Sequence, residues 1–506
     1  MSGGPAVKKT VEMPFQLSTG ASMTYSTAKK ILAIPCIILL DLLAISLSML
    51  IAYITRTHVL PRLMPGFFEQ ELLANTVQGL WWLPLVIIAC MAYEDLYQKR
   101  LPYWKEAEKT LKACTLAIIF SISLLYLAKL SEEMSRTLVM ITWVSTVVLI
   151  PLIRYMGKRL LVRTNIWNKP ILIIGAGKTG ELLVKALTRE QTMGYQIIGF
   201  LDDDKEISGI TNPASQKEIP VLGNFDDAER IILAAKVQEV IVAAPGMPAK
   251  QLVQLTNQLQ PLVNNVMIVP DLFGLSMNGI EVEYFFDEQT LLLNVKNQLK
   301  STLNRSIKRV FDLTIGSIIL LVSIPLLLLI AVAIKLDSKG PALFAQERLG
   351  QNGGTFTCYK FRTMFTDGDK LLKKYLKTNG QARDEWTTFN KLKDHDPRVT
   401  KVGSILRRFS LDELPQVINV ILGDMSLVGP RPYLPRERKQ MGNWAHDIHV
   451  AKPGITGLWQ VSGRNEIEFE GRLKLDTWYV RNWSLWLDLI LLIKTTKVVI
   501  FKKGAY

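Results

Sequence analysis

The sequence predicts a membrane protein that combines a bundle of transmembrane helices with α/β domains. Three observations predict this class. First, 49% of the 506 residues are hydrophobic, the mean hydropathy is +0.19, and long apolar runs fill much of the chain before residue 155. Second, strand-like and helix-like segments alternate between residues 169 and 269, beginning at a glycine-rich turn. Third, a later apolar run, residues 313–334, contains a proline and precedes a region rich in arginine and carboxylate side chains.

Residues 26–165 are predicted to form a four-helix transmembrane domain, preceded by a polar tail, residues 1–25, that we expect to be disordered. A membrane-spanning helix needs about 20 apolar residues. The two shorter runs therefore depend on flanking basic side chains, Arg154 among them, that reach out to the lipid headgroups. Asp41 is the only charge inside any of the runs. The four apolar runs lie near residues 31–55, 72–93, 113–128 and 137–153.

Lysine and arginine predict the orientation of these helices. Basic residues concentrate before the first run, between the second and third runs, and after the fourth, whereas the other two loops contain few. Because basic loops stay on the cytoplasmic side, everything after residue 165 is predicted to lie in the cytoplasm. The net charge of +15 agrees with a surface that faces anionic lipid. The chain has no basic stripe interleaved with aromatic residues, so nucleic acid is not an expected partner.

Residues 166–300 are predicted to form a Rossmann-like, doubly wound α/β domain followed by a connector, which begins near residue 271. A buried strand leads into a turn that contains Gly175, Gly177 and Gly180, and the next strand ends in three aspartates about 20 residues further on. The glycines either bind the phosphates of a nucleotide or only let a helix pack closely on a strand, and the pattern by itself leaves both interpretations open.

Residues 301–506 begin with the later apolar run, for which we predict a re-entrant membrane helix over residues 306–336. Ser323 and Pro325 are predicted to break it in the middle, because proline lacks a backbone donor and its ring clashes with the preceding turn. Basic residues flank both ends, beginning with the pair Lys308–Arg309, which favours both ends on the same side of the membrane. The alternative is a proline-kinked helix that crosses the membrane.

A pair of carboxylates lies between basic side chains in the stretch from residue 405 to residue 432. Arg407 and Arg408 precede Asp412 and Glu413, and Arg431 follows in a rigid Gly-Pro-Arg-Pro loop. Such carboxylates can attack a phosphate ester or hold a divalent cation, while arginines clamp phosphate oxygens. We expect Arg407 or Arg408 to keep Asp412 ionised. The competing interpretation is a helix-capping box, with Ser410 as the N-cap and Glu413 three residues later.

Magnesium is the metal that this composition favours. The four histidines form no cluster, and the four cysteines have no metal-binding or redox spacing. We therefore expect an oxygen-liganded ion, with Asp412 and Glu413 as its ligands.

The C-terminal part contains two further features. Residues 453–464 are rich in glycine and end at Arg464, which suits a loop that binds a nucleotide or a sugar. Residues 478–501 are apolar but interrupted by charges, and they contain tryptophans. They are therefore predicted to form amphipathic helices at the membrane interface.

Taken together, four motifs resemble one family. They are YKFRTM (residues 359–364), SLDELPQ (410–416), GDMSLVGPRP (423–432) and KPGITGLWQVSGR (452–464). They are similar to those of the bacterial polyprenyl-phosphate sugar-1-phosphate transferases, the monotopic phosphoglycosyl transferases. The order of four helices, a Rossmann-like module and this catalytic region resembles the large subgroup, and most closely its galactose-specific members.

The resemblance implies transfer of a hexose 1-phosphate from a UDP-sugar to undecaprenyl phosphate in the bacterial inner membrane, with release of UMP on the cytoplasmic face. Galactose is the expected hexose and glucose the alternative. The step initiates O-antigen, capsule or exopolysaccharide synthesis. The resemblance also implies that Asp412 is a nucleophile forming an aspartyl phosphosugar, that Glu413 assists as a base or metal partner, and that the protein can be a homodimer. The phosphate-binding residues it suggests, with those of the central stretch, are Lys360, Arg362, Arg407, Arg408, Arg431 and Arg464.

Two other classes of protein remain to be compared with this one. A membrane-bound nucleotide-sugar dehydratase needs a second glycine-rich fingerprint and a Tyr-x-x-x-Lys pair, and residues 301–506 contain neither. A nucleotide-binding scaffold without enzymatic activity would use the glycine-rich turn but has no need of two carboxylates between arginines. Release of UMP from a UDP-sugar discriminates among the three.

Overall fold

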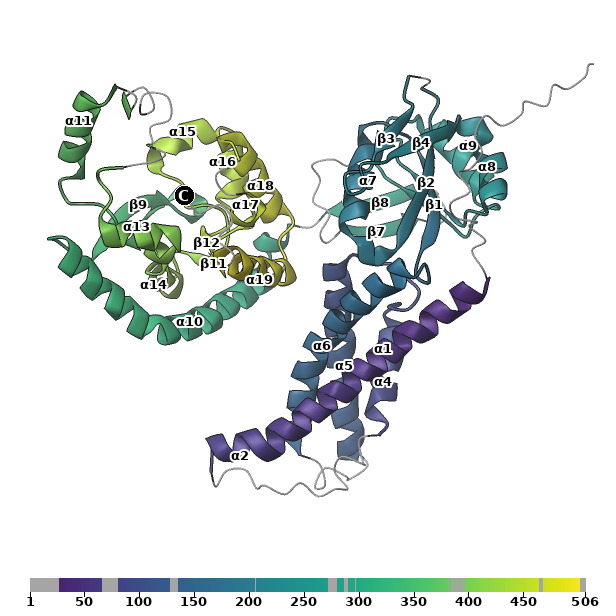
Figure 1. The fold of residues 1–506 in the computed structure, drawn as a ribbon, viewed down its shortest axis with the longest axis horizontal. Helices are drawn as coiled ribbons and strands as arrows, with labels where there is room; N and C mark the ends of the chain where they lie inside the picture. Colours follow the sequence, from purple (N-terminus) through teal and green to yellow (C-terminus); the bar gives the residue numbers. More distant parts are fainter. Residues whose placement is uncertain are drawn as a thin grey trace, which may run out of the picture. The chain divides into compact units, whose positions relative to one another are not determined.

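The computed structural model divides the chain into two compact units, Met1–Asp271 and Leu272–Tyr506, both drawn in Figure 1. The boundary falls inside the range 166–300 that the sequence suggested for one domain and its connector. The residues that the structure describes are 27–65, 81–127, 135–204, 206–271, 280–285, 290–295, 297–380, 382–383, 386, 392, 396–463 and 467–500.

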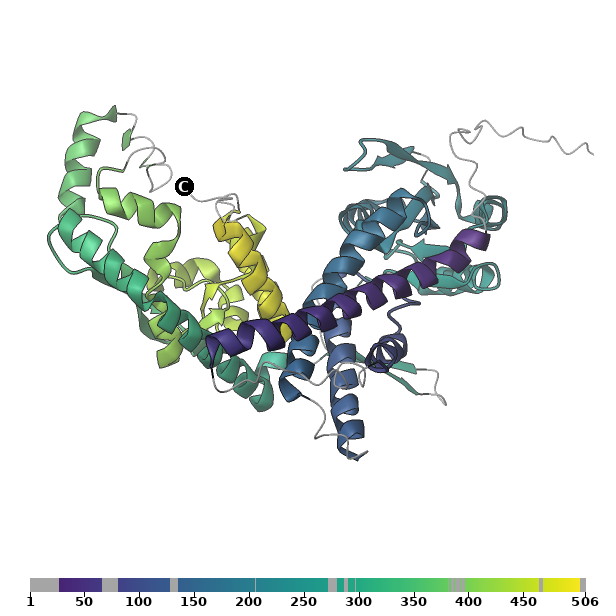
Figure 2. The same ribbon diagram turned by 60° about the horizontal axis from the view of Figure 1, so that its bottom comes forward.

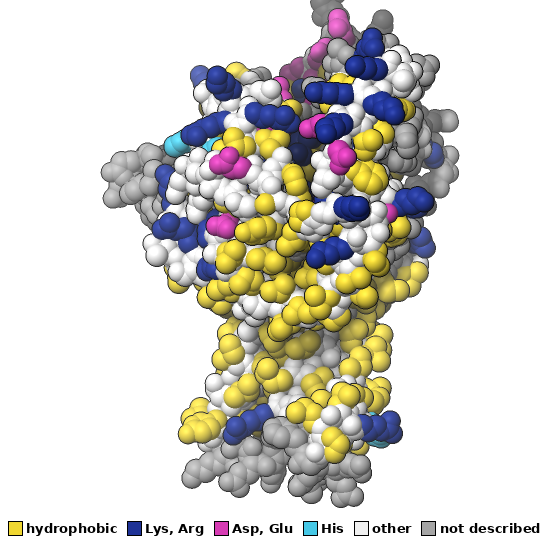
Figure 3. Space-filling model, turned by 90° about the vertical axis from the view of Figure 1, so that its left-hand side faces the viewer, with side chains coloured by type: hydrophobic (Ala, Val, Ile, Leu, Met, Phe, Trp, Pro, Cys, Tyr) yellow, Lys and Arg dark blue, Asp and Glu magenta, His cyan; other side chains and the backbone are white. Residues whose placement is uncertain are grey.

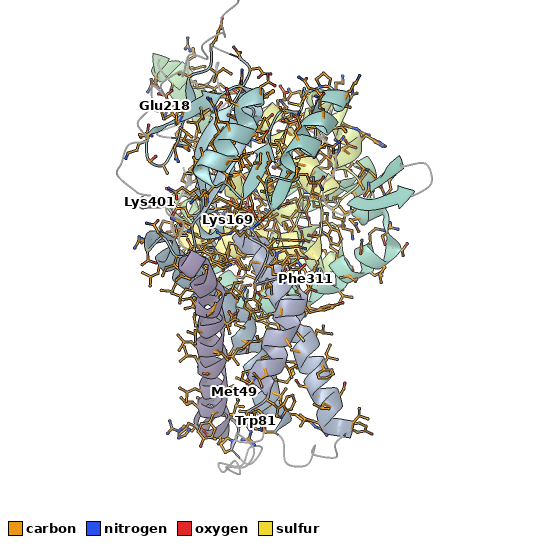
Figure 4. All side chains as sticks on the ribbon, turned by 90° about the vertical axis from the view of Figure 1, so that its right-hand side faces the viewer. Met49, Trp81, Lys169, Glu218, Phe311 and Lys401 are labelled. Carbon is orange, nitrogen blue, oxygen red and sulfur yellow. The ribbon has the colours of Figure 1, made fainter. Side chains whose placement is uncertain are left out.

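Long apolar helices form the first part of unit 1. Three of them, Leu32–Leu63, Tyr103–Leu127 and Arg136–Arg163, are long and apolar enough to cross a membrane, and Leu83–Tyr93 is a shorter apolar helix. Residues 72–80 of the second predicted run lie outside the described residues. Figure 4 shows Met49 and Trp81 toward the end of the bundle that lies away from Lys169 in the sheet. The helices are α1 Thr27–Ile54, η1 Thr55–Val59, α2 Leu60–Leu63, α4 Leu83–Tyr93, α5 Tyr103–Leu127 and α6 Arg136–Arg163.

Buried charges connect these helices. Arg154 on α6 is 1% exposed and donates to Asp41 on α1 at 2.7 Å and to Glu106 on α5 at 2.8 Å. Lys158, one turn further along α6, also donates to Glu106 at 2.6 Å. The expectation that Arg154 reaches the lipid headgroups is therefore wrong, because buried carboxylates on two neighbouring helices neutralise it. The lone Asp41 is its partner, and removing either one would leave a buried charge uncompensated.

The second part of unit 1 is a six-stranded sheet in the order β3-β4-β2-β1-β5-β6. Every neighbouring pair is parallel except β3 with β4. One face of β1 packs with α8 and α9, and the other with α7, so helices cover both faces and the α/β prediction is confirmed. The elements are β1 Lys169–Ile174, α7 Lys178–Arg189, η2 Gln191–Met193, β2 Tyr195–Leu201, β3 Gly209–Thr211, β4 Glu218–Gly223, η3 Phe225–Asp227, α8 Ala228–Ala235, β5 Glu239–Val242, α9 Ala249–Leu259 and β6 Asn265–Ile268.

Close packing explains two of the three glycines between β1 and α7. Gly175 has a φ of +103°, and a Cβ there would lie 2.7 Å from the carbonyl oxygen of Ala243. A Cβ on Gly180 would lie 2.4 Å from the carbonyl oxygen of Gly175, whereas one on Gly177 would meet nothing within 4 Å. In addition, the backbone N–H of Ala176 already donates to a carboxylate oxygen of Asp202 at 2.6 Å. These contacts favour the packing interpretation for Gly175 and Gly180.

Unit 2 begins with a hairpin that the sequence analysis missed. Two antiparallel strands, β7 Ile280–Phe285 and β8 Thr290–Val295, pair within the segment expected to be a connector. The short 3-10 turn η4 Gln298–Lys300 follows. The second strand, Thr-Leu-Leu-Leu-Asn-Val, does not alternate between apolar and polar residues, so the period-2 signal of a half-buried strand is absent there.

The long helix α10, Thr302–Asp337, is a single helix of 36 residues that passes through Pro325. The predicted break at Ser323 and Pro325 is therefore wrong as secondary structure. The hydroxyl of Ser323 donates to the carbonyl oxygen of Leu320 at 3.1 Å, and the helix curves over its length instead of ending (Figure 1). It runs along one side of unit 2 in both ribbon views (Figures 1 and 2). Only 17% of its most apolar window is buried.

The rest of unit 2 packs a hairpin, a two-stranded parallel sheet and short helices around an apolar core. Strand β10 runs into the YKFRTM motif, and helix α14 follows the carboxylate pair. The elements are β9 Leu343–Leu349, η5 Gln351–Gly353, β10 Thr355–Phe361, α11 Gly368–Thr378, α13 Lys401–Arg408, η6 Leu411–Glu413, α14 Gln416–Leu422, β11 Ser426–Val428, η7 Pro435–Glu437, α15 Arg438–Met441, α16 Trp444–Ile448, β12 Gly454–Thr456, α17 Leu458–Ser462, α18 Phe469–Arg481 and α19 Leu485–Ile500.

The last two helices differ from the prediction of interfacial anchors. Trp483, between α18 and α19, is 3% exposed and belongs to the core. Its indole N–H donates at 3.0 Å to Asp488, a fully buried residue of α19. Lys308 of α10 donates to the same carboxylate at 2.6 Å. The charge that interrupts the apolar pattern is therefore half of a buried ion pair, which a pattern of single residues does not reveal.

Candidate active site

The carboxylate pair lies on a tight turn between two helices. Helix α13 ends at Arg408, and Ser410 then adopts a left-handed conformation with φ 55°. Asp412 and Glu413 follow on the 3-10 turn η6. The side chain of Ser410 makes no N-cap hydrogen bond, so the capping-box interpretation is wrong. The chain reverses at Ser410 and presents the acids on a short turn instead of in the first turn of a helix.

Helix α10 packs against this turn. Leu411, the residue before Asp412, packs with Ile330 and Ile334 of α10 and with Phe361 of β10 in one apolar cluster. The carboxylates are therefore held by the second half of the helix predicted to enter the membrane.

A cavity of about 930 Å³ opens over the carboxylates. Its wall combines the two acids with six basic residues. The structure brings Lys360, Arg362, Arg407 and Arg431 to this wall as the sequence suggested, whereas Arg408 does not line it. Arg464 lies outside the described residues. The basic lining residues are Arg348, Lys360, Arg362, Arg398, Arg407 and Arg431.

Lys360 and Arg407 neighbour the carboxylates in different ways. The ammonium group of Lys360, on β10, donates to Glu413 at 2.6 Å. Arg407 uses its Nε to donate to the hydroxyl of Thr363 at 2.9 Å. Lys360 therefore partly neutralises the pair, and Arg407 lines the same cavity.

The environment of Asp412 raises its pKa instead of lowering it. Burial is the main cause and the negative charge of Glu413 is the second, and together they outweigh Lys360 and Arg407 and move the pKa to about 6. Arg407 favours the ionised form as expected, but its effect is outweighed, so the net shift of the pKa is upward. With a pKa near 6, Asp412 is still mostly ionised at neutral pH. Its buried carboxylate is less stabilised by water than an exposed carboxylate.

Arg362 makes its hydrogen bonds to the backbone of the protein itself. The side chain is 6% exposed and donates to the carbonyl oxygen of Ser338 at 2.8 Å and to that of Lys339. These carbonyls follow the last turn of α10. Arg362 therefore fastens the end of α10 to β10, beside the cavity.

Two arginines at the cavity were not singled out from the sequence. Arg348 of β9 donates to the carbonyl oxygen of Pro432 at 3.0 Å and to the side chain of Gln346 at 2.7 Å. Arg398 is held by Asp396 through both carboxylate oxygens, at 2.8 and 2.7 Å. The sequence feature that could have identified Arg348 is its place on β9, the strand that pairs with the strand of Lys360. Residues two apart on such a strand share a face. That signal is weak without the pairing register.

The loop that carries Arg431 is fixed by a buried acid far along the chain. Asp476 of α18 is fully buried, and it accepts the backbone N–H of Arg431 at 3.0 Å and the hydroxyl of Tyr433 at 2.9 Å. Burial raises the pKa of Asp476 to about 7. The guanidinium of Arg431 then lies 5.3 Å from the ring centroid of Trp459, which also lines the cavity. No local pattern connects these residues.

The first half of α10 is bonded to the same region. Lys308 donates to the carbonyl oxygen of Val428 at 3.0 Å, and Arg309 donates to those of Val420 and Ile421 at the end of α14. Both side chains of the basic pair that precedes the apolar run are therefore bonded to backbone carbonyls of unit 2.

The donor set suits a magnesium ion that also binds substrate. Among the described residues no group of three or more histidine, cysteine, aspartate or glutamate side chains is placed to hold a metal. Asp412 and Glu413 are two adjacent oxygen donors at an open cavity, and magnesium is commonly held by one or two carboxylates together with the phosphates of its substrate. The residues present fit that arrangement.

Comparisons with known proteins agree with this site. A family described as bacterial sugar transferase matches residues 303–502, and a family described as CoA-binding domain matches residues 93–270. Undecaprenyl-phosphate galactose phosphotransferase of Salmonella typhimurium is 36% identical over 81% of this chain and 84% of its own. UDP-galactose-lipid carrier transferase of Erwinia amylovora is 36% identical over 81% and 84%.

A third relative is named for a different sugar. UDP-glucose:undecaprenyl-phosphate glucose-1-phosphate transferase of Escherichia coli is 32% identical over 68% of this chain and 71% of its own. The chain belongs to the bacterial sugar transferase family, whose matched region contains the carboxylate pair and the cavity. It is a transferase, and its long apolar helices make it a membrane protein.

Proposed function

We propose that the protein transfers a hexose 1-phosphate, galactose 1-phosphate first among the candidates, from a UDP-sugar to undecaprenyl phosphate and releases UMP. The observation that carries the proposal is the pair Asp412–Glu413 at a cavity lined by six basic side chains. Two strongly anionic phosphate substrates need such a wall of cations. The names of the relatives support the acceptor, and two of those described support galactose. On this proposal the reaction initiates O-antigen, capsule or exopolysaccharide synthesis at the cytoplasmic face of the inner membrane.

In the first half-reaction, a carboxylate oxygen of Asp412 attacks the β-phosphorus of the UDP-sugar. A bond forms between this oxygen and phosphorus, the bond from the β-phosphorus to the bridging oxygen breaks, and UMP leaves with that oxygen and its electron pair. The sugar phosphate remains as an aspartyl ester. Lys360, Arg407 and Arg431 at the wall neutralise charge on the phosphoryl oxygens.

In the second half-reaction, a phosphate oxygen of undecaprenyl phosphate attacks the same phosphorus. The ester bond to Asp412 breaks, the carboxylate is regenerated, and the hexose 1-phosphate is now linked to the lipid as a diphosphate. Splitting the transfer in two lets a water-soluble donor and a lipid acceptor use one site in turn. Glu413 keeps Lys360 beside the reacting centre through their ion pair of 2.6 Å.

Magnesium belongs to this proposal as a cofactor. Asp412 and Glu413 would hold it, and when bound it neutralises the diphosphate of the donor and favours departure of UMP. Removal of divalent cations with a chelator should then stop UMP release, and adding magnesium back should restore it.

The same proposal places both ends of α10 on the cytoplasmic face, so that the helix enters one leaflet without crossing. Its 36 residues span about 54 Å. Its first half is bonded to α14 and β11 through Lys308 and Arg309, and its second half packs on β10 and α13. The contacts of both halves with one compact unit support this placement.

The test uses purified full-length protein with undecaprenyl phosphate, magnesium and either UDP-galactose or UDP-glucose. The proposal expects UMP and a lipid-linked hexose, a higher kcat/KM with UDP-galactose, and no product with Asp412→Asn, which keeps the shape of the side chain but removes its charge. If UDP-glucose were used equally well or better, glucose would replace galactose as the proposed sugar. If the Asp412→Asn variant turned over at the wild-type rate, the carboxylate of Asp412 would have no part in the chemistry.

A further inference from the structure

Part of the lining of this otherwise basic cavity is apolar, and we call this part the apolar rim. Leu343, Phe344 and Phe365 all line the cavity, yet they are 44%, 47% and 37% exposed. Pro341 also lines the cavity. Exposed apolar residues are ordinary when scattered singly, but a cluster of them at the mouth of a charged site indicates a surface that something apolar covers.

The hairpin β9–β10 aligns this apolar rim with the reactive centre. Phe344 lies directly opposite Lys360 in the antiparallel ladder, so their side chains are neighbours on one face of the hairpin. Gln346 and Arg348 follow Phe344 along β9 at intervals of two residues and share that face, and both line the cavity. One face of the strand therefore runs from an exposed phenylalanine to an arginine, with Lys360 and its partner Glu413 beside it.

The apolar rim continues the apolar surface of α10. The helix ends at Asp337, and only residues 338–342 separate it from β9. Leu336, in its last turn, is 83% exposed. In Figure 3, apolar side chains gather over the side of unit 2 that α10 lines, with basic side chains beyond them. A molecule that reaches the rim from this side comes from an apolar surface and meets cations at the end of its path.

Such a gradient fits an amphiphile with an apolar chain and an anionic head. We propose that Leu343, Phe344 and Phe365 form the subsite for the first isoprene units of the polyprenyl phosphate acceptor, whose phosphate then reaches Lys360. This inference rests on the proposed function and adds the residues that receive the acceptor. The acceptor is favoured over a general lipid contact because Phe344 faces the cavity beside Lys360 and does not only cover the outer surface of α10.

The test separates the two half-reactions in the full-length protein. Phe344→Gln should raise the KM for undecaprenyl phosphate about tenfold, because one aromatic contact with an apolar chain is lost. The formation of UMP from UDP-galactose without lipid should change less than about twofold. Phe344→Leu, which keeps an apolar side chain, should retain most of the affinity. Leu303→Gln is the matched control, since Leu303 is exposed on the first turn of α10 and does not line the cavity.

Two results would overturn the subsite. An equal loss of both half-reactions in Phe344→Gln would place Phe344 at the donor site or in the stability of the fold. A parallel loss of binding to vesicles of phosphatidylglycerol and phosphatidylethanolamine would make the rim a contact for the bilayer.

A binding arm makes failure of the subsite distinguishable from failure of the proposed function. A photoreactive prenyl phosphate should crosslink Asp412→Asn protein within residues 341–349, and Phe344→Gln should reduce that product. Crosslinking elsewhere overturns the subsite even if the enzyme is active. An enzyme that is inactive with every UDP-sugar but crosslinks at this rim contradicts the proposed function alone.

Discussion

Asp412 combines two properties that are hard to obtain together. On the proposed function, its carboxyl group must be ionised to attack phosphorus, and it must be poorly solvated to attack quickly. Burial and the charge of Glu413 raise its pKa to about 6, while Lys360 holds Glu413 at 2.6 Å and limits the rise. The arginines that the sequence places before the pair contribute less than their proximity suggests, because one of them is bonded to Thr363 and the other does not line the cavity.

The pH dependence of UMP release follows from the direction of this shift. Because the pKa of Asp412 is raised to about 6, the reactive carboxylate is lost as the pH falls through that value. The rate of the first half-reaction should therefore fall about tenfold per pH unit below 6 and be level above about 7. A rate measured by rapid quench that stays constant from pH 7 down to 4.5 would contradict the raised pKa.

Asp476 accepts the hydrogen bonds that position the loop of Arg431, and we expect an uncharged acceptor to serve as well. Asp476→Leu removes the acceptor of the Arg431 N–H and the Tyr433 hydroxyl, which should cost about 1–3 kcal/mol of stability and reduce UMP release. Asp476→Asn keeps an acceptor oxygen and should retain the fold and most of the activity. Melting temperature and initial rate, measured side by side, check both. A dead but stable Asp476→Asn would show that the carboxylate takes part in chemistry.

At the scale of elements, hydrophobic periodicity and turn-forming residues were sufficient to predict the helices and strands whose contacts are local. The strand–turn–helix alternation of residues 169–269 appears as expected, since it depends on a repeat that a short window displays. The helix α10 shows the limit. Its proline predicts a break, yet the helix continues as a curve, and the side chains that hold it, Lys308 and Arg309, bond to residues more than 100 positions away.

The glycine-rich turn offers a test of packing against ligand binding. Gly180→Ala should destabilise unit 1, because the new Cβ would lie 2.4 Å from a backbone oxygen that cannot move freely, whereas Gly177→Ala meets open space and should be silent. Thermal unfolding and UMP release of the two variants give the comparison. A large loss of UMP release in a Gly177→Ala protein of normal stability would mean that the turn binds a ligand needed for the reaction.

At the scale of the whole molecule, composition and motif order predicted the order of the parts along the chain but not the contacts between distant residues. Helices, sheet and catalytic region follow one another as the sequence indicates, because each has its own composition. The residues that complete the cavity were not predictable in this way. Arg348, Arg398 and Asp476 become relevant only through pairing across strands or helices, and a chain without its fold gives no sign of which arginines will meet.

The orientation of α10 belongs to this scale, because it decides where the cavity lies. In a protein whose four native cysteines have been replaced, single cysteines at Leu303 and Lys339 should both react with a membrane-impermeant reagent from the cytoplasmic side only. Lys339 is preferred to its neighbour Gly340, where a Cβ would lie 2.5 Å from Arg362. A cysteine at Arg62, in the loop predicted to lie outside, is the control. Labelling of Lys339→Cys from outside would show a helix that crosses the membrane.

The covalent intermediate tests the account most directly. Full-length protein is incubated with UDP-galactose and magnesium but no undecaprenyl phosphate, quenched, digested and analysed by mass spectrometry. We predict one equivalent of UMP and a hexose phosphate on the peptide that contains Ser410–Gln416, removed when undecaprenyl phosphate is added before the quench and absent in Asp412→Asn. If UMP appears only when the lipid is present and no adduct forms, the acceptor attacks the donor directly and Asp412 is not the nucleophile.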